Sequence, residues 1–108
     1  EIVDKLGLQA LTSRVSADGQ VTGGYTCDLL SDVMANAQPG NLWITMQIHQ
    51  NVLAVARLKD LTAILVVNGR QPDEETLRKA DQEGVTVLGT GESAFCVSGK
   101  LYQLLRAA

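Results

Sequence analysis

From residue 41 onward, the apolar and polar positions alternate between the patterns of strands and of helices. Three short apolar runs, 42–48, 61–67 and 85–88, predict strands, and breakers such as Pro39-Gly40 separate them from the neighbouring segments. The run 61–67 is apolar at nearly every position, which is typical of a strand buried on both faces. We therefore expect this strand at the centre of a sheet.

Helical patterns fill the intervals between these runs. We expect a short apolar helix over 52–58, with Asn51 as its N-cap. Pro72 and the acidic residues after it predict the start of a second helix, which should run to about Glu83 and end at Gly84.

The last helix is expected over 93–105, with Ser93 as its cap. Its apolar residues should turn toward the core; they are Phe95, Leu101, Leu104 and Leu105.

The N-terminal part has a less regular pattern. It predicts a short helix near 2–8, a small strand near 9–11 and a loop over 13–20 around Asp18-Gly19. The pair Gly23-Gly24 should open directly into an amphipathic helix. The four-residue spacing of Asp28, Asp32 and Asn36 places these three on one face of that helix, opposite Leu29, Leu30, Val33 and Ala37.

Strands and helices that alternate through short connections give right-handed crossovers and a mostly parallel sheet. The sequence therefore predicts an α/β fold, a three-layer α/β/α sandwich, in one domain over residues 1–108. A chain of 108 residues with 45% hydrophobic content has the size of a single ordinary domain.

The charge pattern bears on partners and location. The net charge is −3 and the nine Lys and Arg residues are scattered, so we expect neither nucleic acid nor an anionic membrane as a partner. There is no apolar run of about 20 residues and no signal-peptide pattern at the start, so we expect a cytoplasmic protein. The chain begins with Glu1, which leaves open whether a few residues have been lost or whether it is a piece of a longer polypeptide.

Cys27 and Cys96 both lie in segments expected to be helical, where a thiol usually behaves as a small buried hydrophobe. A disulfide is not expected in the cytoplasm. Two cysteines without a CxxC spacing, together with the single His49, do not supply the ligands of an iron–sulfur cluster or a structural zinc site. We therefore expect no metal and no cofactor.

Ligands of open parallel sheets bind outside the carboxyl ends of the strands. The residues at those ends are polar, small or glycine: His49, Gln50 and Asn51 after the first run, Asn68, Gly69 and Arg70 after the second, and Thr90, Gly91, Glu92 and Ser93 after the third. We place Thr22, Gly23 and Gly24 with them, together with Asp28. A glycine pair before a helix can bind an anion, although a tight turn with a packing role explains the same residues better, since no P-loop or GxGxxG pattern is present.

Within the run 42–48, alternation places Trp43, Thr45, Gln47 and His49 on one face and apolar residues on the other. If buried, Gln47 and His49 need partners, and they form either a structural network or the floor of a pocket.

The stretch 20–37, with 41–45, 49–51, 67–70 and 93–95, closely resembles the DRTGG domain family. Thr22, Gly23 and Gly24 match the name-giving motif, but Gln20-Val21 stand where the family has Asp-Arg. The resemblance implies a small α/β/α sandwich that regulates and dimerises, found alone or beside CBS domain pairs in regulated pyrophosphatases. It places catalytic activity in other domains.

We therefore expect a non-catalytic regulatory or interaction domain, homodimeric, that senses a small anionic or nucleotide-like ligand at the carboxyl ends of its strands. One alternative is an adaptor for a redox partner of the hydrogenase type, or for a kinase or phosphotransfer partner encoded nearby. A second is a small phosphoryl- or acyl-transfer enzyme that uses Asp28, His49 or Glu92.

Overall fold

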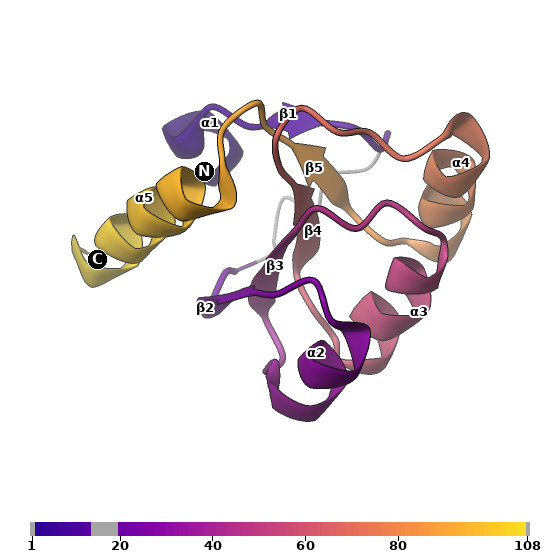
Figure 1. The fold of residues 1–108 in the computed structure, drawn as a ribbon, viewed down its shortest axis with the longest axis horizontal. Coiled ribbons are helices and arrows are strands. Elements are labelled where there is room, and N and C mark those ends of the chain that lie inside the picture. Colours follow the sequence, from indigo (N-terminus) through magenta and orange to yellow (C-terminus); the bar gives the residue numbers. More distant parts are fainter. Residues whose placement is uncertain (1, 14–19, 108) are drawn as a thin grey trace.

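The computed structural model describes residues 2–13 and 20–107. One sheet in the order β1-β5-β4-β3-β2 runs through the middle of the molecule (Figure 1). Its strands are β1 (Gln9–Ala10), β2 (Gly23–Thr26), β3 (Asn41–Thr45), β4 (Ala63–Val66) and β5 (Val87–Gly89). Strands β2 to β5 are parallel, and β1 is antiparallel to β5. The central place expected for the run 61–67 is confirmed, because it contains β4.

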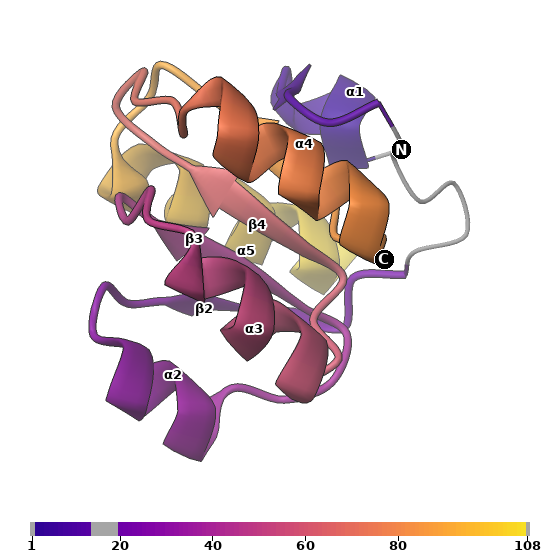
Figure 2. The ribbon, with the colours of Figure 1, turned by 90° about the vertical axis from the view of Figure 1, so that its right-hand side faces the viewer.

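Helices cover both faces of this sheet (Figures 1 and 2). Helices α1 (Ile2–Leu6) and α5 (Ala94–Ala107) lie on one face, and α2 (Leu30–Asn36), α3 (Asn51–Leu58) and α4 (Glu74–Glu83) lie on the other. The three-layer α/β/α sandwich with a mostly parallel sheet is thus confirmed. Among the described residues, none of the helices combines the length and the apolar character needed to cross a membrane.

The two core clusters follow from alternation along the strands. Trp43 and Ile64 are fully buried toward α2, α3 and α4, while Leu42 and Leu65 are fully buried toward α1 and α5. The indole Nε1 of Trp43 donates a hydrogen bond of 2.8 Å to the carbonyl of Cys27, which satisfies its one buried donor.

Helix ends are largely where the sequence predicts them. Asp73 caps α4 by accepting from the Thr76 N–H at 2.8 Å, and Gly84 ends the helix with a φ of 74°. Ser93 accepts from the Cys96 N–H at 3.1 Å at the start of α5. The expected N-cap of α3 is wrong, because Asn51 is its first helical residue. The Nδ1 atom of His49 accepts from the Asn51 N–H at 3.1 Å in its place.

The segment after the glycine pair also differs from the prediction. Gly23 and Gly24 belong to strand β2, where Gly24 is opposite Leu42, and helix α2 begins only at Leu30. Asp28 therefore lies in the loop between them, and Cys27 is not helical either. Pairing with the buried strand β3 decides the conformation here, against the low strand propensity of glycine. The N-terminal helix and small strand are present as expected, but the loop expected over 13–20 falls mostly on residues 14–19, outside the described residues.

The orientation predicted for Phe95 is wrong as well. Its side chain is 90% exposed, whereas Leu101 is 2% exposed. Val97 and Leu101 define the buried face of α5, and a residue two positions before Val97 is rotated by about 200° around the helix axis. Phe95 therefore points away from the core.

Candidate functional site

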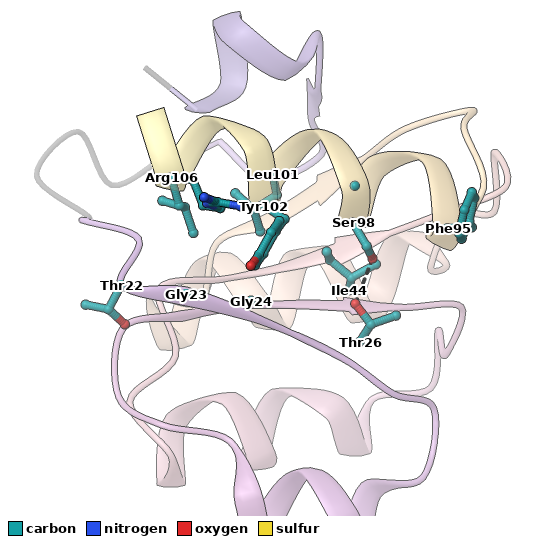
Figure 3. A pocket seen from close by; sticks show the side chains of 12 residues that line it. Thr22, Gly23, Gly24, Thr26, Ile44, Phe95, Ser98, Leu101, Tyr102 and Arg106 are labelled. Atoms are coloured by element: carbon teal, nitrogen blue, oxygen red, sulfur yellow. Dashed lines mark hydrogen bonds between the residues drawn. The ribbon is translucent and has the colours of Figure 1, made fainter. Parts of the chain in front are cut away.

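A hollow with a volume of about 700 Å³ lies between β2 and α5 (Figure 3). Gly23, Gly24 and Thr26 line it from β2, and Thr22 lines it from just before this strand. Phe95, Ser98, Leu101, Tyr102 and Arg106 are among those that line it from α5. We call β2 and this side of α5 the β2–α5 surface. Among the described strands β2 has one neighbour, β3, so the surface includes an edge of the sheet.

Close contact between β2 and α5 fixes the shape of this hollow. A β-carbon on Gly24 would lie 2.8 Å from Cδ2 of Leu101, so the glycine lets the helix pack directly on the strand. Farther along, the hydroxyls of Thr26 and Ser98 share a hydrogen bond of 2.7 Å. These two contacts hold the helix along the strand.

Thr22 anchors the turn that leads into β3. Its N–H donates to the Gly40 carbonyl at 3.0 Å, and its hydroxyl donates to the Pro39 carbonyl at 3.0 Å. Gly40 has a φ of +85°, and a β-carbon there would lie 2.7 Å from Thr22. The Thr-Gly-Gly stretch therefore has the packing role that the sequence suggests, but the expected tight turn is wrong, because Gly23 and Gly24 lie in strand β2.

The glycine pair does not join the strand-end residues, so this expectation is wrong. Gly23 is the first residue of β2, whereas His49, Asn68 and Thr90 follow the last residues of β3, β4 and β5. Because these strands are parallel, their carboxyl ends lie together on one side of the sheet. The amino end of β2 lies on the opposite side.

Two aromatic side chains stand exposed on α5. Phe95 is 90% exposed and Tyr102 is 63% exposed, and the guanidinium carbon of Arg106 lies 5.8 Å from the centre of the Tyr102 ring. The sequence prediction missed these residues. Their spacing carries the signal, since Phe95, Gly99, Tyr102 and Arg106 follow the i, i+4, i+7, i+11 pattern of a single helix face.

The loops at the carboxyl ends of β4 and β5 come together, as expected. The N–H of Asn68 donates to the Glu92 carbonyl and the N–H of Gly69 donates to the Thr90 carbonyl, both at 2.9 Å. A small cavity of about 220 Å³ lies here, and Gly69, Arg70 and Thr90 line it with Gln9, Leu11, Gln71, Gly89 and Gly91.

Asp28 and Gln47 form a hydrogen-bonded network at the ends of β2 and β3. Asp28 Oδ1 accepts from the Thr45 hydroxyl at 2.7 Å and from the Met46 N–H at 2.8 Å. The Gln47 amide donates to the Asp28 carbonyl at 2.9 Å, and Arg70 Nη1 donates to the Met46 carbonyl at 2.8 Å. Gln47 is thus part of a structural hydrogen-bond network and not of a pocket floor. His49 and Asn51 are exposed beside it.

Glu92, which precedes α5, pairs with Lys100 in the second turn of this helix. Lys100 Nζ lies 2.5 Å from Glu92 Oε2, and this hydrogen bond together with the carboxylate charge raises the pKa of the lysine. The other oxygen, Oε1, is buried and has no hydrogen-bond partner among the described residues.

A separate polar cluster surrounds Asp32 on the other face of the sheet. The carboxylate accepts from the Cys27 thiol at 3.1 Å, the Tyr25 hydroxyl at 3.0 Å and the Asn36 amide at 2.6 Å. These hydrogen bonds, that of Cys27 foremost, lower the pKa of Asp32. Burial and the bond to Asp32 raise the pKa of Tyr25. The backbone hydrogen bond with Leu29 lowers the pKa of Cys27, but the bond to Asp32 and burial outweigh it and raise the pKa overall.

We find neither a disulfide nor a metal-ligand cluster among the described residues. Cys27 and Cys96 are both free thiols, and residues 2–13 and 20–107 contain no cluster of three His, Cys, Asp or Glu that could hold a metal ion. The three residues of the enzyme alternative each have a local hydrogen-bond partner. Asp28 accepts from the Thr45 hydroxyl, His49 accepts from the Asn51 N–H, and Glu92 accepts from Lys100.

Comparison with known proteins shows a likeness of fold to a solved structure. No protein-family model matches the chain, and no curated protein matches it. Its structure is similar to the crystal structure of the CBS and DRTGG domains of the regulatory region of Clostridium perfringens pyrophosphatase, complexed with its activator diadenosine tetraphosphate. The TM-score is 0.76 at 17% sequence identity, over 94% of this chain and 44% of the solved one. The chain thus spans less than half of that region, and the likeness shows a shared fold, in agreement with the resemblance to DRTGG domains.

Proposed function

We propose that this chain is a non-catalytic regulatory domain that acts by binding another protein surface, and that it functions as a homodimer. The observation that carries the proposal is the β2–α5 surface, where an edge strand, a hollow of about 700 Å³ and two exposed aromatic rings lie together. Aromatic side chains and arginine are enriched where proteins bind one another. Edge strands that remain unpaired attract further strands, so native proteins normally cover them.

The shared fold supports a regulatory role. The solved structure with this fold comes from the regulatory region of an enzyme and not from its catalytic part. The strand-end side chains support the non-catalytic part of the proposal, because Asp28, His49 and Glu92 are held by local hydrogen bonds and by an ion pair.

Sedimentation velocity of the unmodified chain over a wide concentration range tests the proposal. We expect a dimer that dissociates on dilution. A monomer at every concentration would contradict the homodimer.

A small anionic or nucleotide-like ligand at the strand ends is a second candidate function. The cavity of about 220 Å³ between Gly69, Arg70 and Thr90 favours this function. An arginine side chain and glycine backbone line it at the carboxyl ends of the strands. The fold neighbour is complexed with a nucleotide activator, diadenosine tetraphosphate.

Thermal unfolding with ATP or diadenosine tetraphosphate tests this candidate. A ligand at 100 times its Kd adds about 2.7 kcal/mol to the free energy of unfolding. We expect Arg70→Ala to remove the shift and Arg78→Ala, on the exposed side of α4, to keep it. A shift that survives Arg70→Ala places the ligand elsewhere.

A further inference from the structure

We propose that the hollow between β2 and α5 binds a small aromatic carboxylate, with the ring of the ligand beside Tyr102 and its carboxylate on Arg106. This inference goes beyond the proposed function, because it concerns the hollow itself and not a protein that covers the surrounding surface. The volume of about 700 Å³ lies within the range of about 300–1,000 Å³ that is usual for small-molecule sites.

The side chains around the hollow favour an aromatic ligand body. More than half of them are apolar or aromatic, namely Ile44, Phe95, Leu101, Tyr102 and Leu105. The ring of Tyr102 is 63% exposed and points from α5 toward β2 (Figure 3). Aromatic rings attract each other in offset or edge-to-face arrangements, so a flat ring is a favourable partner for Tyr102.

Three glycines keep the hollow open. Gly23 and Gly24 line it from β2 with backbone alone, and Gly99 does so from α5. Gly99 is exposed, and a β-carbon placed on it would contact nothing within 4 Å, so no packing inside the described chain requires a glycine there. Because glycine destabilises a helix interior relative to alanine, its presence needs another reason. Access of a ligand to the hollow gives that reason.

Arg106 supplies a positive charge at the same place. Its guanidinium carbon lies 5.8 Å from the centre of the Tyr102 ring, and no carboxylate of residues 2–13 and 20–107 forms an ion pair with it. The planar guanidinium matches the two oxygens of a carboxylate. The hollow therefore places a ring and an unpaired cation side by side, as an aromatic carboxylate requires.

The position of Arg106 favours a single carboxylate over a chain of phosphates. It lies in the last turn of α5, where the helix dipole is negative and disfavours a polyanion. Phosphate groups bind preferentially at the amino ends of helices. The residues that line the hollow include neither a lysine nor a second arginine.

Calorimetric titration with naphthoate, a two-ring aromatic carboxylate, tests the site. We expect a Kd of about 1 mM or below, as is usual for a ligand of this size. The neutral amide of naphthoate should bind at least about tenfold more weakly, because it loses the charged hydrogen bonds to Arg106. Equal binding of acid and amide would overturn the proposal, and so would ATP that displaces naphthoate and binds more tightly.

Two variants separate charge from space. Arg106→Gln should raise the Kd for naphthoate by at least about tenfold, whereas the matched control Arg78→Gln, on the exposed side of α4, should leave it unchanged. Gly99→Leu should abolish binding, because the leucine side chain fills the hollow. The open space around Gly99 means that this variant should fold, which thermal unfolding of the free protein checks. Unchanged binding in Arg106→Gln and Gly99→Leu would overturn the proposal.

Amide chemical shifts locate the bound probe. Naphthoate should shift the amide signals of Gly24 and Gly99, which line the hollow. It should leave the signals of Gly69 and Gly91 unchanged, because these glycines line the cavity at the strand ends. The reverse pattern would place the probe at the strand ends and overturn the assignment to the hollow.

The outcomes keep this inference apart from the proposed function. Sedimentation velocity decides whether the chain dimerises, and the titrations decide whether the hollow binds naphthoate. A dimer that does not bind naphthoate overturns the inference and leaves the proposed function standing. A monomer that binds naphthoate through Arg106 supports the inference and overturns the homodimer.

Discussion

Gly24 of β2 and Leu101 of α5 approach so closely that a β-carbon on the glycine would lie 2.8 Å from Leu101 Cδ2. Leu101 is 2% exposed and belongs to the core beneath α5. The second glycine of the Thr-Gly-Gly stretch therefore sets the distance between an edge strand and the helix that covers it.

We expect Gly24→Ala to lower the free energy of unfolding by about 1–3 kcal/mol, because the added methyl overpacks the core against Leu101. Gly91→Ala is the matched control, since a β-carbon there meets nothing within 4 Å. Urea unfolding of both variants measures the difference. Equal stability of the two would show that Leu101 moves aside at no cost.

Alanine substitutions at Gly40 and Gly84 distinguish the cost of backbone strain from the cost of a steric clash. Both have a positive φ, of 85° and 74°, so alanine should cost about 1 kcal/mol at either position. At Gly40 the new β-carbon would also lie 2.7 Å from Thr22, whereas the space at Gly84 is empty. Gly40→Ala should therefore be the more destabilising by a further 1 kcal/mol or so in chemical denaturation. A smaller loss at Gly40 than at Gly84 would contradict this role of Thr22.

Asp28 should contribute to stability through its two hydrogen bonds and not to turnover. We expect Asp28→Ala to cost about 2 kcal/mol, because Thr45 and the Met46 N–H lose a charged acceptor. Asp28→Asn keeps the Oδ1 acceptor and should lose less than half as much. Thermal unfolding of the two variants gives the comparison, and equal losses would mean that the charge, not the acceptor, matters.

The cluster around Asp32 should give stability a defined pH dependence. The folded pKa of Asp32 is lowered, so its contribution is complete above the unfolded pKa of about 4 and is lost as the pH falls through the folded pKa. Asp32→Asn should therefore be less stable than the unmodified chain at pH 7, and the gap should shrink toward pH 3. A gap of constant size across urea titrations at both pH values would contradict the assignment.

The contribution of Tyr25 to stability should depend on pH in the opposite direction. Its folded pKa is raised, so its contribution is present below the unfolded pKa of about 10 and is lost as the pH rises through the folded pKa. The stability gap between Tyr25→Phe and the unmodified chain should narrow above pH 10. Unfolding at pH 7 and pH 11 measures it, and a wider gap at pH 11 would exclude the bond to Asp32 as the cause.

The sequence predicts the order of strands and helices well after residue 41, because most elements there have their own period and their own end signals, although the expected N-cap of α3 is wrong. The run that contains β4, the capped helix α4 and the stop at Gly84 all follow from local chemistry. Segment 22–37 fails because its four-residue spacing suggests one helix, whereas parallel pairing with β3 makes Gly23–Thr26 a strand. That pairing is a tertiary contact and leaves no local signal.

The candidate site was predictable only in part. The strand-end loops meet as the parallel topology requires, which brings Asn68 and Gly69 to Thr90 and Glu92. The hollow beside α5 was not foreseen, because a count of apolar residues assigned Phe95 to the core. The rotation of about 200° around the helix axis between Phe95 and the buried Val97 would have placed Phe95 on the exposed face.

The two edges of the described sheet differ in length and direction. Strand β1, with two residues, runs antiparallel at one edge, while the longer β2 lies at the other. Very short edge strands recruit further strands poorly. Two copies that join through β2 would present only β1 at both outer margins, so the assembly would stop at two copies and would not extend into a fibre.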